Sequence, residues 1–283
     1  MGAAASMTGS RWFRTAAPSA ATVAVLECVW WARAAGEHRL VPDGCMDLLW
    51  LPGPSGRGSA WLCGPDTHSW SFSLPPGTPI AGVRFRAGAA PSVFRVAADS
   101  LRDRRARVED LLGARAERAL LDRIEHVEAD AGSTRATVLE AWVTRRAGAG
   151  SAARDQTARI ARSMREGATT VEALASRSGL STRQLHRRFA ASVGYGPAFY
   201  GRVARLQRFI RLAAPRPSVG VAALAVYAGY ADQAHLARDC RELAGTTPTA
   251  LRSELLNTSA SFELERVRFV QDRRTVDASR WSA

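Results

Sequence analysis

The chain has 283 residues, of which 46% are hydrophobic and 23% are charged, so it is long enough for two domains that each bury a core. Its formal net charge is +13, and all 39 basic residues are arginines. Four cysteines without a CxxC pair exclude a disulfide scaffold. Because no signal peptide or apolar run of about 18 residues is present, we expect a cytoplasmic protein without a membrane segment.

Residues 21 to 96 alternate short apolar runs with turn-forming residues. Each run is bounded by clusters of proline, glycine and aspartate, which predicts strands at Thr22–Trp31, Met46–Leu51, Ser59–Cys63, Ser69–Leu74 and Ile80–Arg86. Short strands at this spacing favour a barrel or a sandwich.

Several side chains of this strand region are candidates for a ligand pocket, namely Asp43, Cys45, Asp47, Trp61, His68, Arg84 and Arg86. Two alternatives stand beside this interpretation. Asp43 and Gly44 also suit a hairpin turn, and Arg84 and Arg86 alternate with apolar neighbours as the outward face of a strand does. Only His38 and His68 lie in this region, so we expect no metal and no cofactor.

Six of the eight tryptophans lie within the first 70 residues. Trp12, Trp30, Trp31, Trp50, Trp61 and Trp70 are expected mainly in the barrel core. The alternative is that the indoles line an apolar pocket for a flat or hydrophobic effector.

After Pro91 the pattern becomes helical. Helices are predicted at Ala98–Arg104, Val108–Leu112, Ala114–Ala129 and Ser133–Arg146, and the last two carry apolar stripes at helical spacing. The small, uncharged residues Ala147–Ala152 then predict a flexible connection. We therefore place an N-terminal domain at 1–146 and a linker at 147–156.

The positive charge is concentrated beyond this linker. Residues 151–256 contain 16 of the 39 arginines and most of the net charge. Such asymmetry is typical of a protein that binds a polyanion, although an arginine-rich chain without lysine also fits a GC-rich genome.

The same half contains one helical unit twice. Leu174, Ala175 and Gly179 recur fifty residues later as Leu224, Ala225 and Gly229, and Ser181, Leu185, Arg187, Gly194 and Pro197 correspond to Asp232, Leu236, Arg238, Gly245 and Pro248. In each unit a glycine ends one helix and a capping side chain starts the next, which predicts two helix-turn-helix units. A helix at 197–214 joins them.

Two such units joined by one helix resemble the DNA-binding domain of the arabinose-operon regulator (AraC) family of bacterial transcription factors. The resemblance covers residues 157–256 and is most specific in the second unit, at Gly229-Tyr230, Asp232-Gln233, Arg238 and Gly245-Thr246-Thr247-Pro248. The segments 39–50 and 82–88 resemble the N-terminal domain of a subset of these regulators, which implies a cupin-like barrel. In that family, helices after the barrel commonly form the dimer interface; covering the barrel is the equal alternative.

The resemblance also implies DNA-contacting positions. Base contacts fall on Arg183, His186 and Arg187 in the first unit and on Gln233, Ala234, Ala237 and Arg238 in the second; Thr182, His235 and Arg202 are further candidates. An arginine fork binds guanine edges, and its alternative is a phosphate contact. Leu236 and Cys240 stand where the family usually has phenylalanine, and we interpret both as core.

We therefore expect an α+β protein: a β-rich, cupin-like barrel with trailing helices, an all-α domain of two helix-turn-helix units joined by a long helix, and a tail at 257–283. The expected function is a sequence-specific transcriptional regulator that is not an enzyme. Its expected partners are the major groove of double-stranded DNA, RNA polymerase, a second copy of the chain and a small-molecule effector. The alternatives are a barrel enzyme or an alkyl-accepting protein, through Cys45, fused to a DNA-binding module, and a non-specific nucleoid protein.

Overall fold

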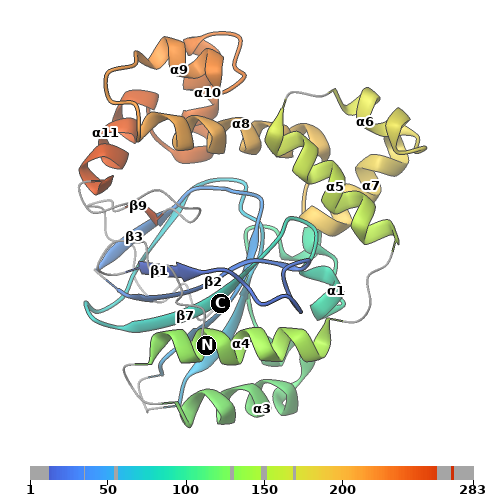
Figure 1. Ribbon diagram of the computed structural model, residues 1–283, viewed down its shortest axis with the longest axis vertical. Helices are drawn as coiled ribbons and strands as arrows, with labels where there is room; N and C mark the ends of the chain where they lie inside the picture. Colours follow the sequence, from blue (N-terminus) through green and yellow to red (C-terminus); the bar gives the residue numbers. More distant parts are fainter. Residues whose placement is uncertain are drawn as a thin grey trace.

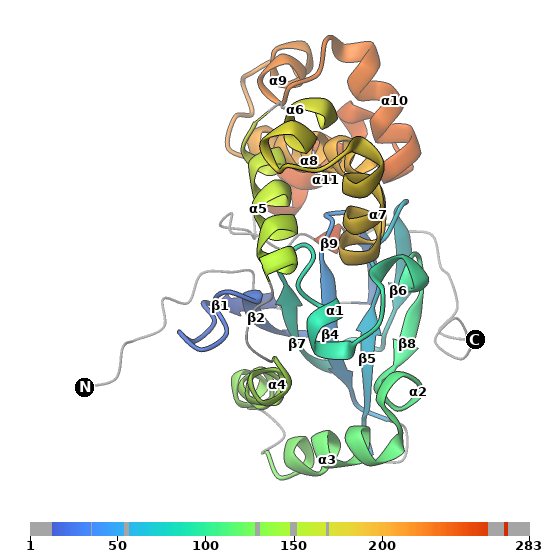
Figure 2. The same ribbon diagram turned by 90° about the vertical axis from the view of Figure 1, so that its right-hand side faces the viewer.

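The computed structural model describes residues 13–34, 36–53, 57–127, 131–147, 152–167, 170–259 and 269–270. A layer of helices from the C-terminal half lies over one end of a β-rich N-terminal half (Figure 1). Two further helices lie on the other side of the β-structure, away from that layer (Figure 2). The expected α+β division into a β-rich half and a helical half is confirmed.

The N-terminal half contains two antiparallel sheets. The larger has the order β1-β2-β7-β4-β5-β8, formed by Phe13–Ala16, Leu26–Arg33, Pro79–Phe85, Met46–Leu51, Ser59–Cys63 and Arg105–Arg107. The smaller has the order β6-β3-β9, formed by Trp70–Ser73, Glu37–Leu40 and Phe269–Val270. Alternate residues of the large sheet pack into one buried cluster that includes Leu48, Leu62 and Val83.

The β-region differs from the sequence prediction in some of its strands and in one helix. Strands β4 and β5 have the predicted bounds, but β2 begins at Leu26 instead of Thr22, and strands β1, β3 and β8 were not predicted. The helix predicted at Ala98–Arg104 is wrong beyond Leu101. A short 3-10 helix, η1, spans Ala98–Leu101, Asp103 takes a left-handed φ of 56°, and Arg105 begins strand β8 on β5.

The helices that follow the barrel cover it. They are α1 at Pro91–Phe94, α2 at Val108–Leu112, α3 at Ala114–Glu125 and α4 at Gly132–Arg146. Leu139, Trp142 and Val143 of α4 are buried in the cluster of the large sheet, and Leu120 and Ile124 of α3 join them. The apolar stripes are thus used inside the domain, and a dimer interface on these helices stays a prediction.

The C-terminal half forms the two predicted units. The helices are α5 at Ala152–Glu166, α6 at Val171–Arg177, α7 at Thr182–Val193, α8 at Pro197–Ala213, α9 at Val221–Tyr227, α10 at Gln233–Ala244 and α11 at Pro248–Ser259. Helix α8 crosses the layer, with α6 and α7 at one end and α9 and α10 at the other (Figure 1). Of the helices that the structure describes, none has the length and apolar character needed to cross a bilayer.

The turn chemistry of both units follows the sequence. Gly179 and Gly229 take φ values of 63° and 90°, so each ends its helix in the left-handed region that glycine tolerates. Ser181 and Gln184 form a reciprocal capping box at the start of α7. Asp232 caps α10 by accepting a hydrogen bond from the backbone N–H of His235 at 2.7 Å.

The two halves share a packed interface. Val41 and Ala87 of the N-terminal half belong to the hydrophobic core of the helical half. Helix α7 rests on η1, where Arg102 donates to the carbonyl of Gly194 at 2.7 Å. Buried Arg39 of β3 donates to the carbonyl of Ala244 at 3.1 Å and pairs with Glu254. The helical half therefore contacts the barrel at both ends of its layer.

Substitutions at two glycines distinguish the cost of backbone strain from the cost of a clash at the interface. Gly179 and Gly194 both have positive φ, but an added Cβ at Gly179 meets nothing within 4 Å, whereas at Gly194 it lies 2.1 Å from Cγ of Pro65. We expect Gly179→Ala to lower the free energy of unfolding by about 1 kcal/mol through strain alone. Gly194→Ala adds the clash across the interface and should cost clearly more. Urea unfolding of both variants measures this, and equal losses would contradict the interface contact.

Candidate DNA interface and effector cavity

Helix α7 presents the predicted contact residues of the first unit to solvent. Leu185 and Phe189 are buried on the inner face, while Arg183, His186 and Arg187 are exposed on the outer faces. Thr182 is also exposed, and Gln184 is occupied by the capping box, as the sequence predicts. The helix thus carries two exposed arginines and a histidine where a major groove would meet it; their contact with bases stays a prediction.

Helix α10 also presents its predicted contact residues to solvent, but fewer of these side chains are polar. Gln233, Ala234 and Arg238 are exposed, and Ala237 is half-buried. His235 is half-buried because its ring stands edge-on to Tyr230, with centroids 5.1 Å apart. This contact gives His235 a packing role within its unit, so Gln233 and Arg238 are the polar side chains best placed for base edges.

Two residues of α10 are core, as predicted. Leu236 and Cys240 have no exposed surface. Burial raises the pKa of the Cys240 thiol to about 12. A thiol with so high a pKa stays protonated near neutral pH, which argues against a redox sensor at this position.

Arg202 has partners inside the domain. Its Nε donates to Oδ1 of buried Asp239 at 2.8 Å, and its terminal nitrogen pairs with Glu242, which ties α8 to α10. Burial lowers the pKa of the Arg202 guanidinium, but these two carboxylates outweigh it and raise the pKa overall. Arg202 therefore positions the second recognition helix, and its predicted contact with DNA phosphate stays a prediction.

Removal of this ion pair should be visible without DNA. Arg202→Ala leaves the buried Asp239 carboxylate with Arg205 at 3.9 Å as its remaining ion-pair neighbour among the described residues. We expect a loss of about 2 kcal/mol in the free energy of unfolding, the scale of a hydrogen bond to a charged group. Arg241→Ala, the same charge change at an exposed site on α10, is the control. Equal unfolding midpoints for the two variants would rule out the positioning role.

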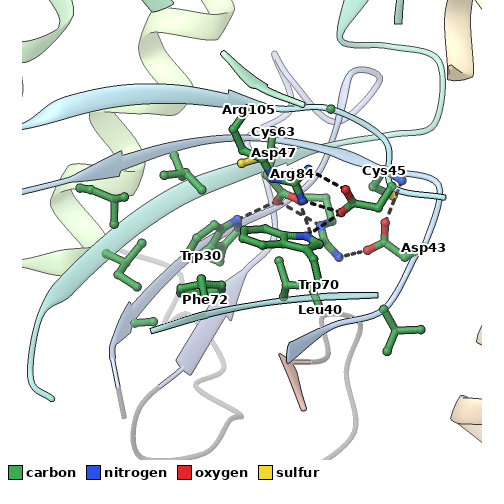
Figure 3. Close-up of a pocket in the computed structure, with 17 residues that line it drawn as sticks. Trp30, Leu40, Asp43, Cys45, Asp47, Cys63, Trp70, Phe72, Arg84 and Arg105 are labelled. Atoms are coloured by element: carbon green, nitrogen blue, oxygen red, sulfur yellow. Dashed lines mark hydrogen bonds and ion pairs between the residues drawn. The ribbon is translucent and has the colours of Figure 1, made fainter. Parts of the chain in front are cut away.

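The barrel holds an apolar cavity between its two sheets. Its walls include Trp30 and Leu49 from the large sheet and Leu40, Trp70 and Phe72 from the small one (Figure 3). About 60 Å³ is open to the centres of water molecules. With a water radius added on every side, this space admits a single ring or a short chain.

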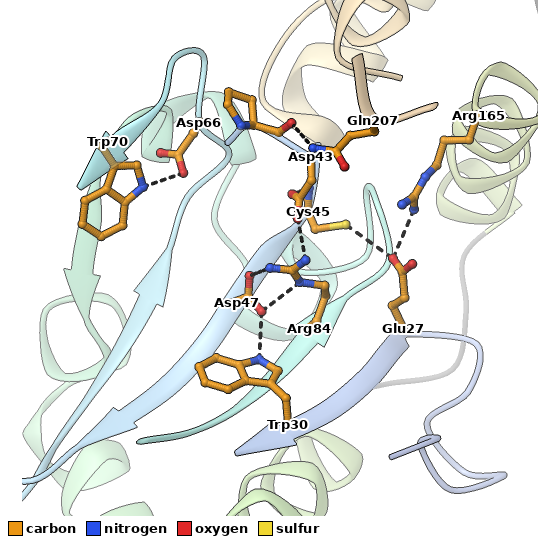
Figure 4. A network of polar contacts seen from close by, with 11 residues as sticks. Glu27, Trp30, Asp43, Cys45, Asp47, Asp66, Trp70, Arg84, Arg165 and Gln207 are labelled. Atoms are coloured by element: carbon orange, nitrogen blue, oxygen red, sulfur yellow. Dashed lines mark hydrogen bonds and ion pairs between the residues drawn. The ribbon is translucent and has the colours of Figure 1, made fainter. Parts of the chain in front are cut away.

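Charged side chains lie along one side of the cavity, around Arg84 and at Asp66 (Figure 4). Arg84 lies between two carboxylates: Nη1 pairs with Asp43 at 2.5 Å, and Nε and Nη2 reach Asp47 at 3.1 and 2.8 Å. Asp47 also accepts a hydrogen bond from Nε1 of Trp30 at 3.0 Å. Farther along, Asp66 accepts from Trp70 at 2.9 Å and pairs with Arg105 at 2.6 Å.

Burial is the largest influence on the pKa of two of these carboxyls, Asp47 and Asp66. It raises the pKa of Asp47 and of Asp66, and the neighbouring arginines only partly offset it. Glu27, just outside the cavity, behaves differently. Burial also raises its pKa, but Arg165 of α5 and Arg84 outweigh burial, so the pKa of Glu27 falls below its ordinary value. The Glu27–Arg165 contact, at 3.1 Å, is an ion pair between the two halves of the chain.

The structure brings four of the seven predicted pocket residues together. Asp43, Cys45, Asp47 and Arg84 line the cavity. The outward orientation considered for Arg84 is wrong, because the side chain is 8% exposed and faces the two aspartates. The sequence interpretation missed Asp66 and Arg105, although the predicted grouping of tryptophans pointed to Trp30 and Trp70.

The other three predicted pocket residues lie elsewhere. Nε1 of Trp61 donates to Ser59 at 2.8 Å outside the cavity. His68 is exposed beside Thr67 and Asp103. Arg86 donates to the carbonyl of Val23 at 2.7 Å and lines a separate cleft between the halves.

The loop Val41–Cys45 joins the cavity to the helical half. Val41 lines the cavity and also belongs to the helical core. The carbonyl of Pro42 accepts from Nε2 of Gln207 on α8 at 2.8 Å. Gly44, with φ 78°, has no room for a Cβ, which would lie 2.5 Å from the Tyr200 ring. A molecule in the cavity therefore touches a loop that α8 also holds.

The cysteines should be inert in the folded chain. All four are buried, and burial raises the pKa of Cys28 and Cys63 to about 12 and that of Cys45 well above its ordinary value. Relative to the ordinary value of 9.0, a pKa of about 12 lowers the thiolate fraction roughly a thousandfold. We expect only a trace of alkylation by iodoacetamide at pH 8 and four modified residues after denaturation, by mass spectrometry. Fast labelling of folded Cys45 would restore the alkyl-accepting alternative.

Two family models match separate parts of the chain. Residues 174–254 match the family model of a helix-turn-helix domain, and residues 14–107 match that of a domain of unknown function, DUF6597. Among curated proteins, none matches the chain. The helix-turn-helix match begins within α6 and contains both candidate recognition helices, α7 and α10.

Three solved structures similar to the chain are of ToxT from Vibrio cholerae. One has 8% identity and a TM-score of 0.42, covering 86% of this chain and 98% of that chain. A complex with (E)-4-(8-methylnaphthalen-1-yl)but-3-enoic acid has 9% identity and a TM-score of 0.43, covering 87% and 100%. An unsaturated-fatty-acid-bound form has 8% identity and a TM-score of 0.41, covering 86% and 96%. At these scores the similarity carries no argument about the ligand of this chain.

Proposed function

We propose that this chain, which is a DNA-binding transcriptional regulator of the AraC type, reads its operator with α7 and α10 together and responds to a small molecule in the barrel cavity. The observation that carries the proposal is the repeated unit. Each copy has a glycine turn, a side-chain cap and an exposed polar helix face, and α8 packs against helices of both copies.

The dimensions of α8 support joint reading of one DNA face. Its 17 residues span about 25 Å at about 1.5 Å per residue. Successive major grooves on one face of DNA are about 34 Å apart. Recognition helices packed at the two ends of α8 are therefore suitably placed for neighbouring grooves, and the arginine-rich composition of residues 151–256 favours the phosphate backbone between them.

The effector role rests on the position of the cavity. It is lined by the loop Val41–Cys45, which contacts α8, and the Glu27–Arg165 pair lies beside this loop. A ligand that binds one arrangement of the loop more tightly also favours one position of α8 on the barrel. The difference between the ligand's binding free energies for the two arrangements is the coupling free energy between the cavity and the DNA site. The signal thus has a short physical route from cavity to recognition helices.

Two partners belong to the same proposal. A second copy of the chain would give two tethered DNA-binding halves and higher affinity for paired sites. RNA polymerase would find an apolar contact at Val226 and Tyr227 of α9, which are 59% and 64% exposed. We assign no catalytic step to the cavity, whose thiols have raised pKa values. Sedimentation of the full chain with and without operator DNA tests the dimer.

The base-reading role is tested by matched arginine variants. We expect Arg187→Ala and Arg238→Ala each to weaken operator binding by about 1–3 kcal/mol and to relax preference at one base pair. Arg188→Ala on α7 and Arg241→Ala on α10 remove the same charge from the same helices and should weaken operator and random DNA alike. Affinities are measured by titration of labelled operator and of scrambled DNA at one salt concentration.

The same DNA titrations can contradict the base-reading role. If Arg187→Ala and Arg238→Ala lose affinity equally for operator and scrambled DNA, the two arginines anchor phosphates only. If the parent chain itself binds both DNAs equally, the non-specific nucleoid alternative replaces the regulator.

A further inference from the structure

We propose that the barrel cavity binds a small cation with an apolar body, of the protonated-amine class, and discriminates against organic acids. The inference rests on the proposed function only in taking the cavity as the effector site. Its basis is the juxtaposition of aromatic walls with a set of charged side chains in which carboxylates outnumber guanidinium groups.

The charges that line the cavity sum to a negative value. Three aspartates, Asp43, Asp47 and Asp66, face two arginines, Arg84 and Arg105. Arg105 and Asp66 form a one-to-one pair. Arg84 is shared between Asp43 and Asp47, so one carboxylate charge at this end of the cavity has no matching cation among the lining residues.

Asp43 also lines a neighbouring cleft with Arg86, Arg162, Arg165 and Arg211, but these arginine charges are paired or screened. Glu27 and Arg165 form a neutral pair beside the loop, and Arg39 is paired with Glu254. Arg162 and Arg211 of the neighbouring cleft are exposed and Arg86 is partly exposed, so water and salt screen their charges. Inside the cavity the dielectric constant is lower, and the excess carboxylate acts on a ligand with less screening.

The hydrogen-bonding groups also favour a donor ligand. Oδ1 of Asp43 accepts from the backbone N–H of Cys45 at 2.8 Å, and Oδ2 accepts from Arg84. Each carboxylate oxygen has two lone pairs, so each can accept a further bond from an ammonium group. A carboxylate ligand brings acceptors to this side and adds a second uncompensated negative charge, which is costly in a buried site.

The aromatic walls suit the apolar part of such a cation. Arg105 already stacks on Trp70, with its guanidinium carbon 3.8 Å from the ring centroid, so a cation is accommodated against an indole here. Trp30 lies so close to Gly82 that a Cβ there would be 2.3 Å from the indole. Because Gly82 has no side chain, the Trp30 ring can pack directly on the backbone of β7 and form a wall of the cavity.

The test uses three probes with one ring and different charge: benzylammonium, benzyl alcohol and benzoate. Each is titrated into the full chain at pH 7 and followed by calorimetry. We expect benzylammonium to bind at least about tenfold more tightly than benzoate, the scale of one hydrogen bond to a charged group, with benzyl alcohol between them. Equal or tighter binding of benzoate overturns the inference, and so does the absence of binding by all three probes.

Charge-matched variants locate the effect. Asp43→Asn removes the excess charge and keeps an oxygen for the Cys45 N–H; it should weaken benzylammonium about tenfold and benzyl alcohol much less. Asp122→Asn makes the same change on the exposed face of α3 and should alter neither. If Asp43→Asn leaves the benzylammonium affinity unchanged, the excess carboxylate is not the recognition group and the inference is wrong.

Cavity-filling variants decide where the probes bind. Ala32→Leu and the milder Cys63→Met enlarge residues that line the cavity and should abolish binding of all three probes, with folding checked by circular dichroism. Retained binding in a folded variant places the probes outside the cavity and refutes the inference. These titrations contain no DNA, so loss of sequence preference in the arginine experiment would overturn the proposed function while leaving this result intact.

Discussion

The loop Val41–Cys45 is the constraint on which the arrangement of the two halves depends. In this loop, Asp43 and Cys45 line the barrel cavity, and Val41 belongs to the helical core. The carbonyl of Pro42 accepts a hydrogen bond from Gln207 of α8. Because Gly44 is packed directly against Tyr200, the loop has little room to move without moving α8. A cavity and a DNA-binding layer that share a loop of this kind form one mechanical unit.

The local structure of the DNA-binding half was predictable because its signals are short-range. A positive-φ glycine and a capping side chain act within three or four residues, so Gly229 and Asp232 define their turn from sequence alone. The role of Arg202 was not accessible in this way. Its partner Asp239 lies 37 residues later, and only the packing of α10 on α8 brings the two side chains together.

Prediction of the cavity residues from the sequence was limited more strongly by such long-range contacts. Asp43, Cys45, Asp47 and Arg84 were identified because polar residues in an apolar strand pattern are conspicuous. Asp66 and Arg105 were missed because the strand after Asp66 pairs with β3 instead of β5, and because Arg105 directly follows a predicted helix, where no strand was expected. Strand order is a long-range property, and local periodicity carries no information about it.

The coupling of cavity and α8 through this loop can be measured directly by backbone hydrogen exchange of the full chain. Asp43→Asn weakens the link between the loop and Arg84, while Asp103→Asn changes a turn outside the cavity and serves as the control. The account predicts faster exchange in α8 for Asp43→Asn only, with α3 and α4 unchanged in both variants. Unchanged exchange in α8 would contradict the claim that the cavity and the DNA-binding layer are one unit.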